Sequence, residues 1–259
     1  MISIVTPVLN GARTIERTLR AMSTQQADFE HIVQDGGSTD GTLEILKRYA
    51  TQYPLRIFQE KDTGLYDAIN RGMNRARGDV LGWINADDFH LPWTLATVQS
   101  VLDRNRSVHW ITGIPSWYFE DTGLSVTASA APVFPRSWIA AGWFANGRLG
   151  ALQQESMFWR RWLWEKAAPT DLMTRYRYAA DFHLWKRFAQ HADLRTVSSV
   201  LSCFTLSSDQ ISTRFLREYQ SECGIPSTRI ERALWARLVT RLTSIIQFRQ
   251  VLKPCAVRR

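Results

Sequence analysis

The chain has 259 residues, of which 45% are apolar and 22% charged, and its formal net charge is +8. This length and composition suit a folded domain with a full core and exclude a disordered chain. The three cysteines are far apart and match no metal spacing, so we expect no structural disulfides. No signal-peptide pattern is visible, and no apolar run reaches the roughly 18 residues of a membrane span. We therefore expect a cytoplasmic protein.

The first hundred residues alternate strand and helix patterns. Apolar runs predict the strands, and apolar residues three or four positions apart predict the helices between them. The predicted strands are at 2–8, 30–35, 55–59 and 80–85, and the predicted helices at 12–25, 42–49 and 66–76. This alternation predicts a parallel sheet with crossover helices, in which the carboxyl ends of the strands share one edge.

The pattern loosens after position 88. We expect a helix at 92–105, a strand at 108–113, and loops with short elements over 113–152. Helical patterns return at 160–168 and 180–191, one more strand is predicted within 195–206, and an apolar stripe from 226 predicts a long helix. Many of the eleven tryptophans lie between 138 and 185, where they suit a core or a sugar-stacking surface.

Positive charge is concentrated at the C-terminal end. Residues 213–259 contain ten Lys and Arg but three Asp and Glu, so this segment alone carries +7. A basic segment suits a polyanionic surface such as anionic lipid or nucleic acid. The predicted long helix is equally compatible with packing on the main domain and with binding a membrane surface or a partner.

Polar blocks follow two of the predicted strands. One block runs from Asp35 to Thr42 and is rich in Gly, Ser and Thr, and the other is Asn85-Ala86-Asp87-Asp88. Carboxylates at the ends of neighbouring parallel strands lie where open α/β sheets bind ligands. A divalent metal with a preference for oxygen would remove the repulsion between Asp87 and Asp88. The blocks therefore predict a nucleotide-plus-metal site, with purely structural turns and helix caps as the alternative.

Six motifs, in order, resemble the family 2 glycosyltransferases of the GT-A fold over about residues 1–210. They are IVTPVLN from Ile4, DGGSTDGT from Asp35, EKDTGLYDAINRG from Glu60, NADD from Asn85, QQESMFWRR from Gln153 and ADFHLW from Ala180. The resemblance implies an α/β, Rossmann-like and mostly parallel central sheet flanked by helices. We expect a GT-A domain at 1–212, with a nucleotide-sugar-binding half at 1–105 and an acceptor and catalytic half at 106–212, and a basic helical extension at 213–259.

The resemblance also implies roles for individual residues. Asp181, near the start of a predicted helix, is the expected general base, with a helix-dipole role as the alternative. A nucleotide-sugar would be bound by Asp62, Arg71 and Asp87, and by Asp35 together with a turn at Thr6 and Pro7. Mn²⁺ or Mg²⁺ would be held by Asp88 and Asp87, and the acceptor by Glu155 and Gln154. Arg71 is as compatible with a surface position as with donor binding. Two positions depart from the family pattern, because Asn85 and Ala180 stand where acidic residues are common.

These features predict a metal-dependent inverting glycosyltransferase that moves a sugar from a nucleoside-diphosphate sugar to a hydroxyl acceptor. One base without an evident second nucleophile predicts inversion. The resemblance favours a saccharide or lipid-linked saccharide acceptor in bacterial surface polysaccharide, lipopolysaccharide or glycolipid synthesis. The basic extension would then hold the enzyme peripherally on the inner face of the plasma membrane.

Three alternatives fit the sequence less well. A nucleotidylyltransferase would need a Gly-rich basic loop after the first strand, where the chain has only Gly11 and Arg13. A nucleic-acid binder would place phosphates against acidic strand ends, so we expect no nucleic-acid partner. A non-catalytic scaffold of the GT-A type has the two departures from the pattern as its support.

Overall fold

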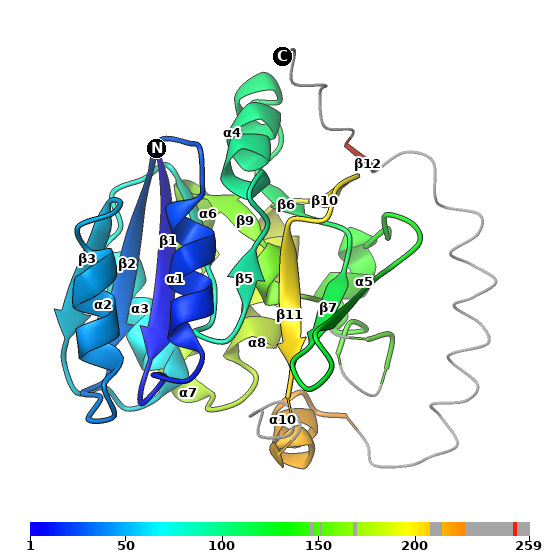
Figure 1. The fold of residues 1–259 in the computed structure, drawn as a ribbon. Coiled ribbons are helices and arrows are strands. Elements are labelled where there is room, and N and C mark those ends of the chain that lie inside the picture. The colour runs from blue at the N-terminus through cyan, green and yellow to red at the C-terminus, as the bar shows by residue number, and fades with distance from the viewer. Residues whose placement is uncertain (146–147, 151, 168–169, 208–213, 226–250, 253–259) are drawn as a thin grey trace.

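The structure, a computed structural model, describes residues 1–145, 148–150, 152–167, 170–207, 214–225 and 251–252 (Figure 1). An eight-stranded sheet forms its centre. In spatial order the strands are β12 (Val251–Leu252), β10 (Leu194–Val197), β6 (Trp110–Thr112), β9 (Phe158–Arg160), β4 (Val80–Trp83), β1 (Ile2–Val8), β2 (Phe29–Asp35) and β3 (Leu55–Gln59). β9 runs antiparallel to β4 and β6, and the other neighbours in this sheet pair in parallel. The predicted mostly parallel sheet is confirmed.

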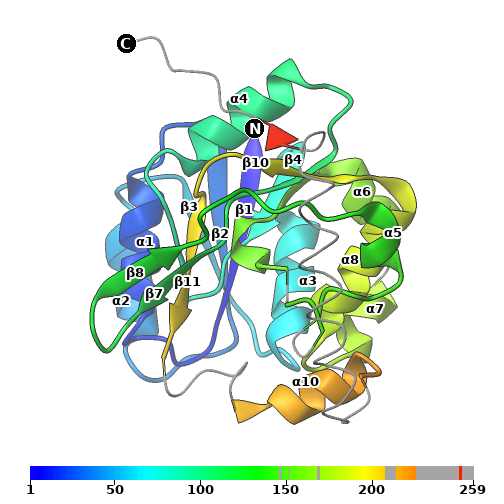
Figure 2. The ribbon, with the colours of Figure 1, turned by 90° about the vertical axis from the view of Figure 1, so that its right-hand side faces the viewer.

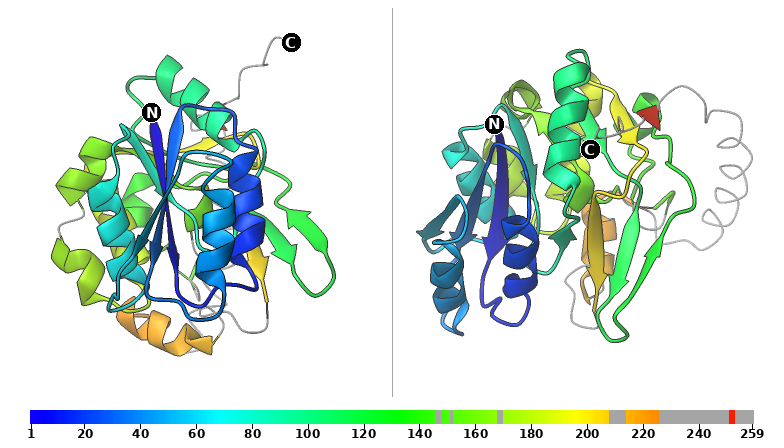
Figure 3. Two further views of the ribbon diagram at one scale, coloured as in Figure 1. Left: turned by 60° about the vertical axis from the view of Figure 1, so that its left-hand side comes forward. Right: turned by 45° about the horizontal axis from the view of Figure 1, so that its top comes forward.

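Helices cover both faces of this sheet, as Figure 3 shows with the strands between two helical layers. The helices are α1 (Ile15–Ser23), α2 (Thr42–Tyr49), α3 (Leu65–Arg75), α4 (Thr94–Arg104), α5 (Arg136–Ala140), α6 (Arg161–Ala167), α7 (Thr170–Arg175), α8 (Ala180–His191) and α10 (Leu216–Glu222). α1 and α2 share an apolar cluster on one face, and α3, α6, α7 and α8 share another on the opposite face. α3 lies close to β1 because Gly72 has no side chain, since a Cβ there would be 2.4 Å from Val5.

A smaller sheet lies beside the large one (Figure 2). Its strands are β5 (Phe89–His90), β11 (Ser202–Leu206), β7 (Ser116–Phe119) and β8 (Leu124–Thr127). The strand predicted within 195–206 is present as β11, and the same segment also contains most of β10, because the chain passes after Val197 from the large sheet to the small one. β9 and the hairpin of β7 and β8 were not predicted, since short runs in a loop-like composition carry little periodicity.

Several tryptophans of the middle segment belong to the core. Trp159, Trp164 and Trp185 are buried, and the Trp185 ring stacks on Trp83 with 5.4 Å between ring centroids. Their burial favours the core interpretation for these three over a sugar-stacking surface.

The described parts of the C-terminal extension are α10 and β12. α10 lies at the bottom of Figure 1, below β11, and β12 adds an edge strand beside β10. The predicted long helix from 226 lies outside the described residues. Within the part of the chain that the structure describes, no helix has the length and apolar character needed to cross a membrane.

Candidate active site

The acidic residues singled out in the sequence follow the carboxyl ends of the strands. Asp35 is the last residue of β2, Asp62 lies between β3 and α3, and Asp87 and Asp88 lie between β4 and β5. β1, β2 and β3 point to the same lower edge in Figure 1, and Asp181 is in the first turn of α8. This edge is where parallel α/β sheets bind ligands.

Asp35 and Asp62 lie close together at this edge. The Asp35 side chain is buried and accepts hydrogen bonds from the Ser38 hydroxyl and from the Ser38 backbone N–H, at 3.1 Å from Oδ1. A Cβ at Gly36 would lie 2.7 Å from Asp62 Oδ2, so a larger residue there would displace the Asp62 carboxylate. Burial, with smaller repulsions from Asp67 and Asp35, raises the pKa of Asp62.

The predicted turn at Thr6 and Pro7 is wrong, because β1 continues to Val8 and both residues are buried within it. The Thr6 hydroxyl is 2.8 Å from Nε2 of the buried His31, so it serves the interior of the sheet. A role of Thr6 and Pro7 in nucleotide binding stays a prediction.

The side chain of Arg71, in α3, is held by Asp67 of the same helix and by the loop before it. Its Nε and Nη2 donate to the two oxygens of Asp67 at 3.1 and 2.9 Å, and Nη1 donates to the Lys61 carbonyl at 3.1 Å. Glu60 lies 3.6 Å from the same guanidinium. These contacts fix the loop that precedes α3, and donor binding by Arg71 stays a prediction.

The two adjacent aspartates differ in exposure. Asp88 is fully buried, its Oδ1 accepts the Thr205 backbone N–H at 2.8 Å, and its Oδ2 has no hydrogen-bond partner. Asp87 is half-buried, and its carbonyl accepts hydrogen bonds from the Arg17 guanidinium at 2.9 Å and from the Thr205 hydroxyl. Asp87 therefore presents the carboxylate that a ligand can reach, whereas Asp88 anchors the loop to β11.

Gln154 and Glu155 lie behind this acidic loop, in a short 3-10 helix (Gln154–Ser156). Glu155 is 1% exposed, and neither of its carboxylate oxygens has a hydrogen-bond partner. Burial, with a smaller repulsion from Asp87, raises its pKa to about 8. Gln154 is buried as well, so acceptor binding by these two residues stays a prediction for which this structure offers no open surface.

An acidic excess at this loop fits a divalent cation. Burial raises the pKa of Asp88 well above its usual range, and the charges of Asp87 and Glu155 raise it further. Among the described residues, no group of three or more His, Cys, Asp or Glu side chains has the geometry of a metal site. Mg²⁺ is commonly held by one or two carboxylates together with substrate phosphates and water. One partly accessible carboxylate, Asp87, therefore suits a cation that arrives with a diphosphate.

Asp181 is joined to the first turn of α3, the helix that follows the loop carrying Asp62. The hydroxyl of Tyr66, in the first turn of α3, donates to Asp181 Oδ1 at 2.9 Å and lies 3.1 Å from the Tyr178 carbonyl. Burial raises the pKa of Asp181 to about 6, and the Tyr66 hydrogen bond moderates this rise. A carboxylate with such a pKa is ionised at neutral pH and still basic enough to accept a proton.

The family model for Glycosyl transferase family 2 matches residues 3–158 of this chain. The chain belongs to this family. The PGL/p-HBAD biosynthesis glycosyltransferase of Mycobacterium bovis is 30% identical to it over 272 aligned residues, which cover 96% of this chain and 98% of the relative.

Solved structures of glycosyltransferases share the fold of this family 2 member. TarS of S. aureus in complex with UDP-GlcNAc superposes with a TM-score of 0.60 at 19% identity, covering 82% of this chain and 60% of TarS 1–349. The mannosyltransferase PcManGT of Pyrobaculum calidifontis in complex with GDP-Man and Mn²⁺ gives 0.59 at 20% identity, covering 85% and 61%. The α/β fold is therefore of the GT-A type, as predicted.

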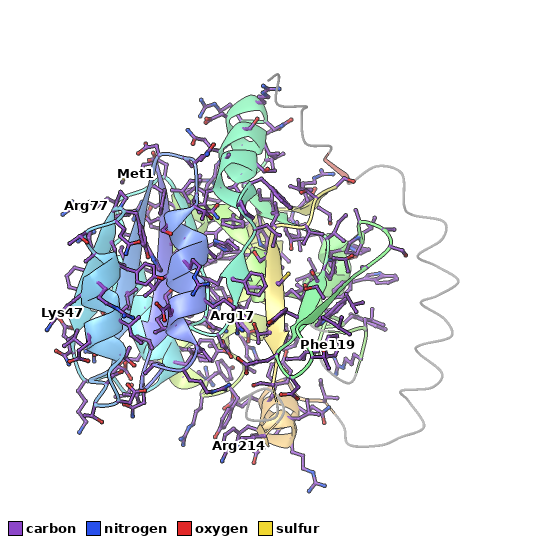
Figure 4. All side chains as sticks on the ribbon, viewed as in Figure 1. Met1, Arg17, Lys47, Arg77, Phe119 and Arg214 are labelled. Carbon is purple, nitrogen blue, oxygen red and sulfur yellow. The ribbon has the colours of Figure 1, made fainter. Side chains whose placement is uncertain are left out.

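Two residues of this glycosyltransferase site were missed in the sequence. Tyr66 stood within a recognised motif, but nothing in the sequence indicates that it meets Asp181. Arg17 belongs to no motif, yet its guanidinium lies between α1 and β11, 5.0 Å from the centre of the Tyr118 ring, and it bonds to Asp87 (Figure 4). Its positive charge lowers the pKa of Asp87, although burial, the largest effect, raises it.

Proposed function

We propose that this family 2 glycosyltransferase transfers a sugar from a nucleoside-diphosphate sugar to an acceptor hydroxyl, with a divalent metal and with inversion. One observation carries the proposal: Asp181, with a pKa of about 6, is hydrogen-bonded to Tyr66 at the start of α3, which follows β3 at the strand-end edge where Asp87 follows β4. A base and a reachable metal-ligand carboxylate at one edge suit a single displacement.

The residues divide the chemistry between them. Asp181 accepts the proton of the acceptor hydroxyl, and the oxygen attacks the anomeric carbon on the face opposite the departing diphosphate, which inverts the configuration. Mn²⁺ or Mg²⁺, when bound, supplies positive charge that stabilises the leaving diphosphate. Asp87 would hold the cation directly, and Asp88 fixes the position of Asp87 through the Thr205 backbone.

Donor recognition falls to the strand ends of the first half. Asp35 and Asp62 offer carboxylate oxygens to N–H groups of a nucleobase and to ribose hydroxyls. Arg71 bonds to Asp67 and Lys61 and so orders the loop between β3 and α3, and in this proposal it thereby shapes the donor site.

The proposal also covers the acceptor substrate and the surface on which the enzyme works. We assign the acceptor to saccharides or lipid-linked saccharides of bacterial surface polysaccharide, lipopolysaccharide or glycolipid synthesis. Residues 213–259, with a net charge of +7, would hold the enzyme on an anionic membrane surface. Sedimentation with anionic vesicles tests this, since the full chain should co-sediment at low salt and a chain ending at Ile225 should not. Equal binding by both chains would contradict the membrane role.

Donor hydrolysis tests the function itself. The protein is incubated with UDP-, GDP- and dTDP-sugars, with and without Mn²⁺, and release of nucleoside diphosphate is measured. Metal-dependent release from one donor is the expected result. No hydrolysis, together with no nucleotide binding by calorimetry, would support a non-catalytic relative instead.

Replacing Tyr66 by Phe is expected to move the acid limb of the pH–rate profile to higher pH. The Tyr66 hydroxyl lowers the pKa of Asp181, so its loss leaves more of the base protonated near pH 6. The rate at pH 6 should fall several-fold and recover by pH 8. Tyr49→Phe, which loses only a 3.4 Å contact to Glu16, is the control. An unchanged acid limb in Tyr66→Phe would argue against this role.

A further inference from the structure

We propose that Glu222, at the end of α10, is a positioning residue for the catalytic base, so that the first helix of the extension is a working part of the active site. The inference rests on the proposed function, because it concerns the orientation of Asp181. It differs from the sequence-based division, in which residues from 213 onward form a separate basic segment.

The Glu222 carboxylate holds the segment that leads into α8. It accepts hydrogen bonds from three consecutive backbone N–H groups, those of Arg177, Tyr178 and Ala179, with N···O distances of 3.1, 2.9 and 2.8 Å. Ala179 is the N-cap residue of α8 and has no side chain that could cap the helix. A residue more than forty positions away therefore provides the acceptor for the N-cap N–H of α8 and for the two N–H groups before it.

The main chain of Glu222 contacts α8 from another side. Its carbonyl accepts a hydrogen bond from His183 Nε2 at 3.0 Å, and the His183 ring stacks on Tyr176 with 3.8 Å between centroids. The next residue, Cys223, is buried in an apolar cluster with Ala145, Ala179 and Phe182. Asp181 thus lies between two residues, Ala179 and His183, that both bond to Glu222.

Tyr178 connects this capping arrangement to the base. Its N–H bonds to Glu222, while its carbonyl lies 3.1 Å from the Tyr66 hydroxyl that donates to Asp181. If the segment 177–179 shifts, one of the two acceptors of Tyr66 shifts with it. Loss of Glu222 is therefore expected to alter the orientation of Asp181 without touching the donor loops.

Glu222 also acts on the base through its charge. Among the described residues, the titratable groups that act on Asp181 are Tyr66 from α3, Glu222 from α10 and the thiol of Cys223, whose pKa burial raises to about 12. The negative charge of Glu222 adds to the rise in the Asp181 pKa caused by burial. Removing this charge lowers the pKa of Asp181, which is opposite in sign to the effect expected for Tyr66→Phe.

Two variants at this position remove different parts of the carboxylate. Glu222→Gln loses the charge and the acceptor for Arg177 N–H, but its amide oxygen can still accept from the N–H groups of Tyr178 and Ala179. Its acid limb should move to lower pH while kcat at pH 8 stays within a few-fold of the parent. Glu222→Ala loses the acceptors as well, and kcat should fall between about tenfold and a hundredfold at an unchanged donor KM, as for a displaced catalytic group. Glu218→Gln, an exposed residue on the same helix, is the matched control.

The readouts distinguish positioning from simple stability. Thermal melting and donor affinity are measured for each variant, and a kcat loss confined to Glu222→Ala in a folded protein with normal donor affinity supports the inference. An acid limb in Glu222→Gln that coincides with that of Glu218→Gln would overturn it, and so would unchanged kcat in Glu222→Ala. Asp181→Asn is assayed in parallel, because normal transfer by that variant would contradict the proposed function and not only the role of Glu222.

Discussion

Asp181→Asn is expected to lower kcat by about 10² to 10⁴, the usual contribution of a general base, while nucleotide-sugar binding stays within a few-fold of the parent. Asn keeps the shape of the side chain and an acceptor for the Tyr66 hydroxyl, but it cannot take a proton from the acceptor substrate. Steady-state kinetics with a competent donor and acceptor, alongside calorimetry with the donor, give both quantities.

The pH dependence of the parent checks the same assignment. Transfer needs the ionised carboxylate, so the rate should fall as the pH drops through about 6, the pKa of Asp181. Asp103→Asn, at an exposed carboxylate on α4, is the control and should keep this profile. Near-parental turnover by Asp181→Asn would show that another group is the base.

Asp181→Asn is also expected to stabilise the protein at neutral pH. The pKa of Asp181 is raised in the folded state from 3.8 to about 6, so folding favours its protonated form. Its contribution to stability is therefore fully present below about pH 4 and is lost as the pH rises toward 6. The variant should melt higher than the parent at pH 7.5, with a smaller difference at pH 4. Replacing a buried carboxylate by a neutral amide removes the cost of keeping a charge away from water.

Asp87→Asn is expected to cost on the order of a hundredfold in metal-dependent turnover, because the variant loses the carboxylate that a cation can reach. Calorimetric titration of the nucleoside diphosphate should show that Mn²⁺ no longer strengthens binding. The loss of charge leaves the Arg17 and Thr205 hydrogen bonds in place, since both go to the Asp87 carbonyl.

Asp88→Asn is the matched comparison, because it removes one charge from the adjacent residue. Asn retains an oxygen for the Thr205 N–H, so we expect a folded protein whose metal-enhanced nucleotide binding persists. If Asp88→Asn abolished that enhancement and Asp87→Asn did not, Asp88 would be the direct ligand, and the proposed division between the two aspartates would be reversed.

The local sequence determined the elements and their order. Strands β1 and β3 and helices α2 and α8 have the predicted bounds, because long apolar stretches and helical spacing reflect burial within a single element. The order of six motifs also indicated the family, which the family match confirms. Short elements were not predicted, because a three-residue strand such as β9 is too short to show an alternation of apolar and polar residues.

Only the tertiary structure shows which of the candidate site residues are buried, paired or accessible. Asp87 and Asp88 are alike in the sequence, yet the backbone of Thr205, more than a hundred positions away, draws Asp88 into the interior and leaves Asp87 accessible. Tyr66 bonds to Asp181 across a similar separation in sequence. Glu222 accepts the N-cap N–H of α8 although it follows that helix in the chain. Side-chain roles of this kind depend on contacts between distant segments, and these contacts exist only after the sheets and helices have packed. The sequence determined which groups are available, and packing decided which of them are buried, paired or accessible.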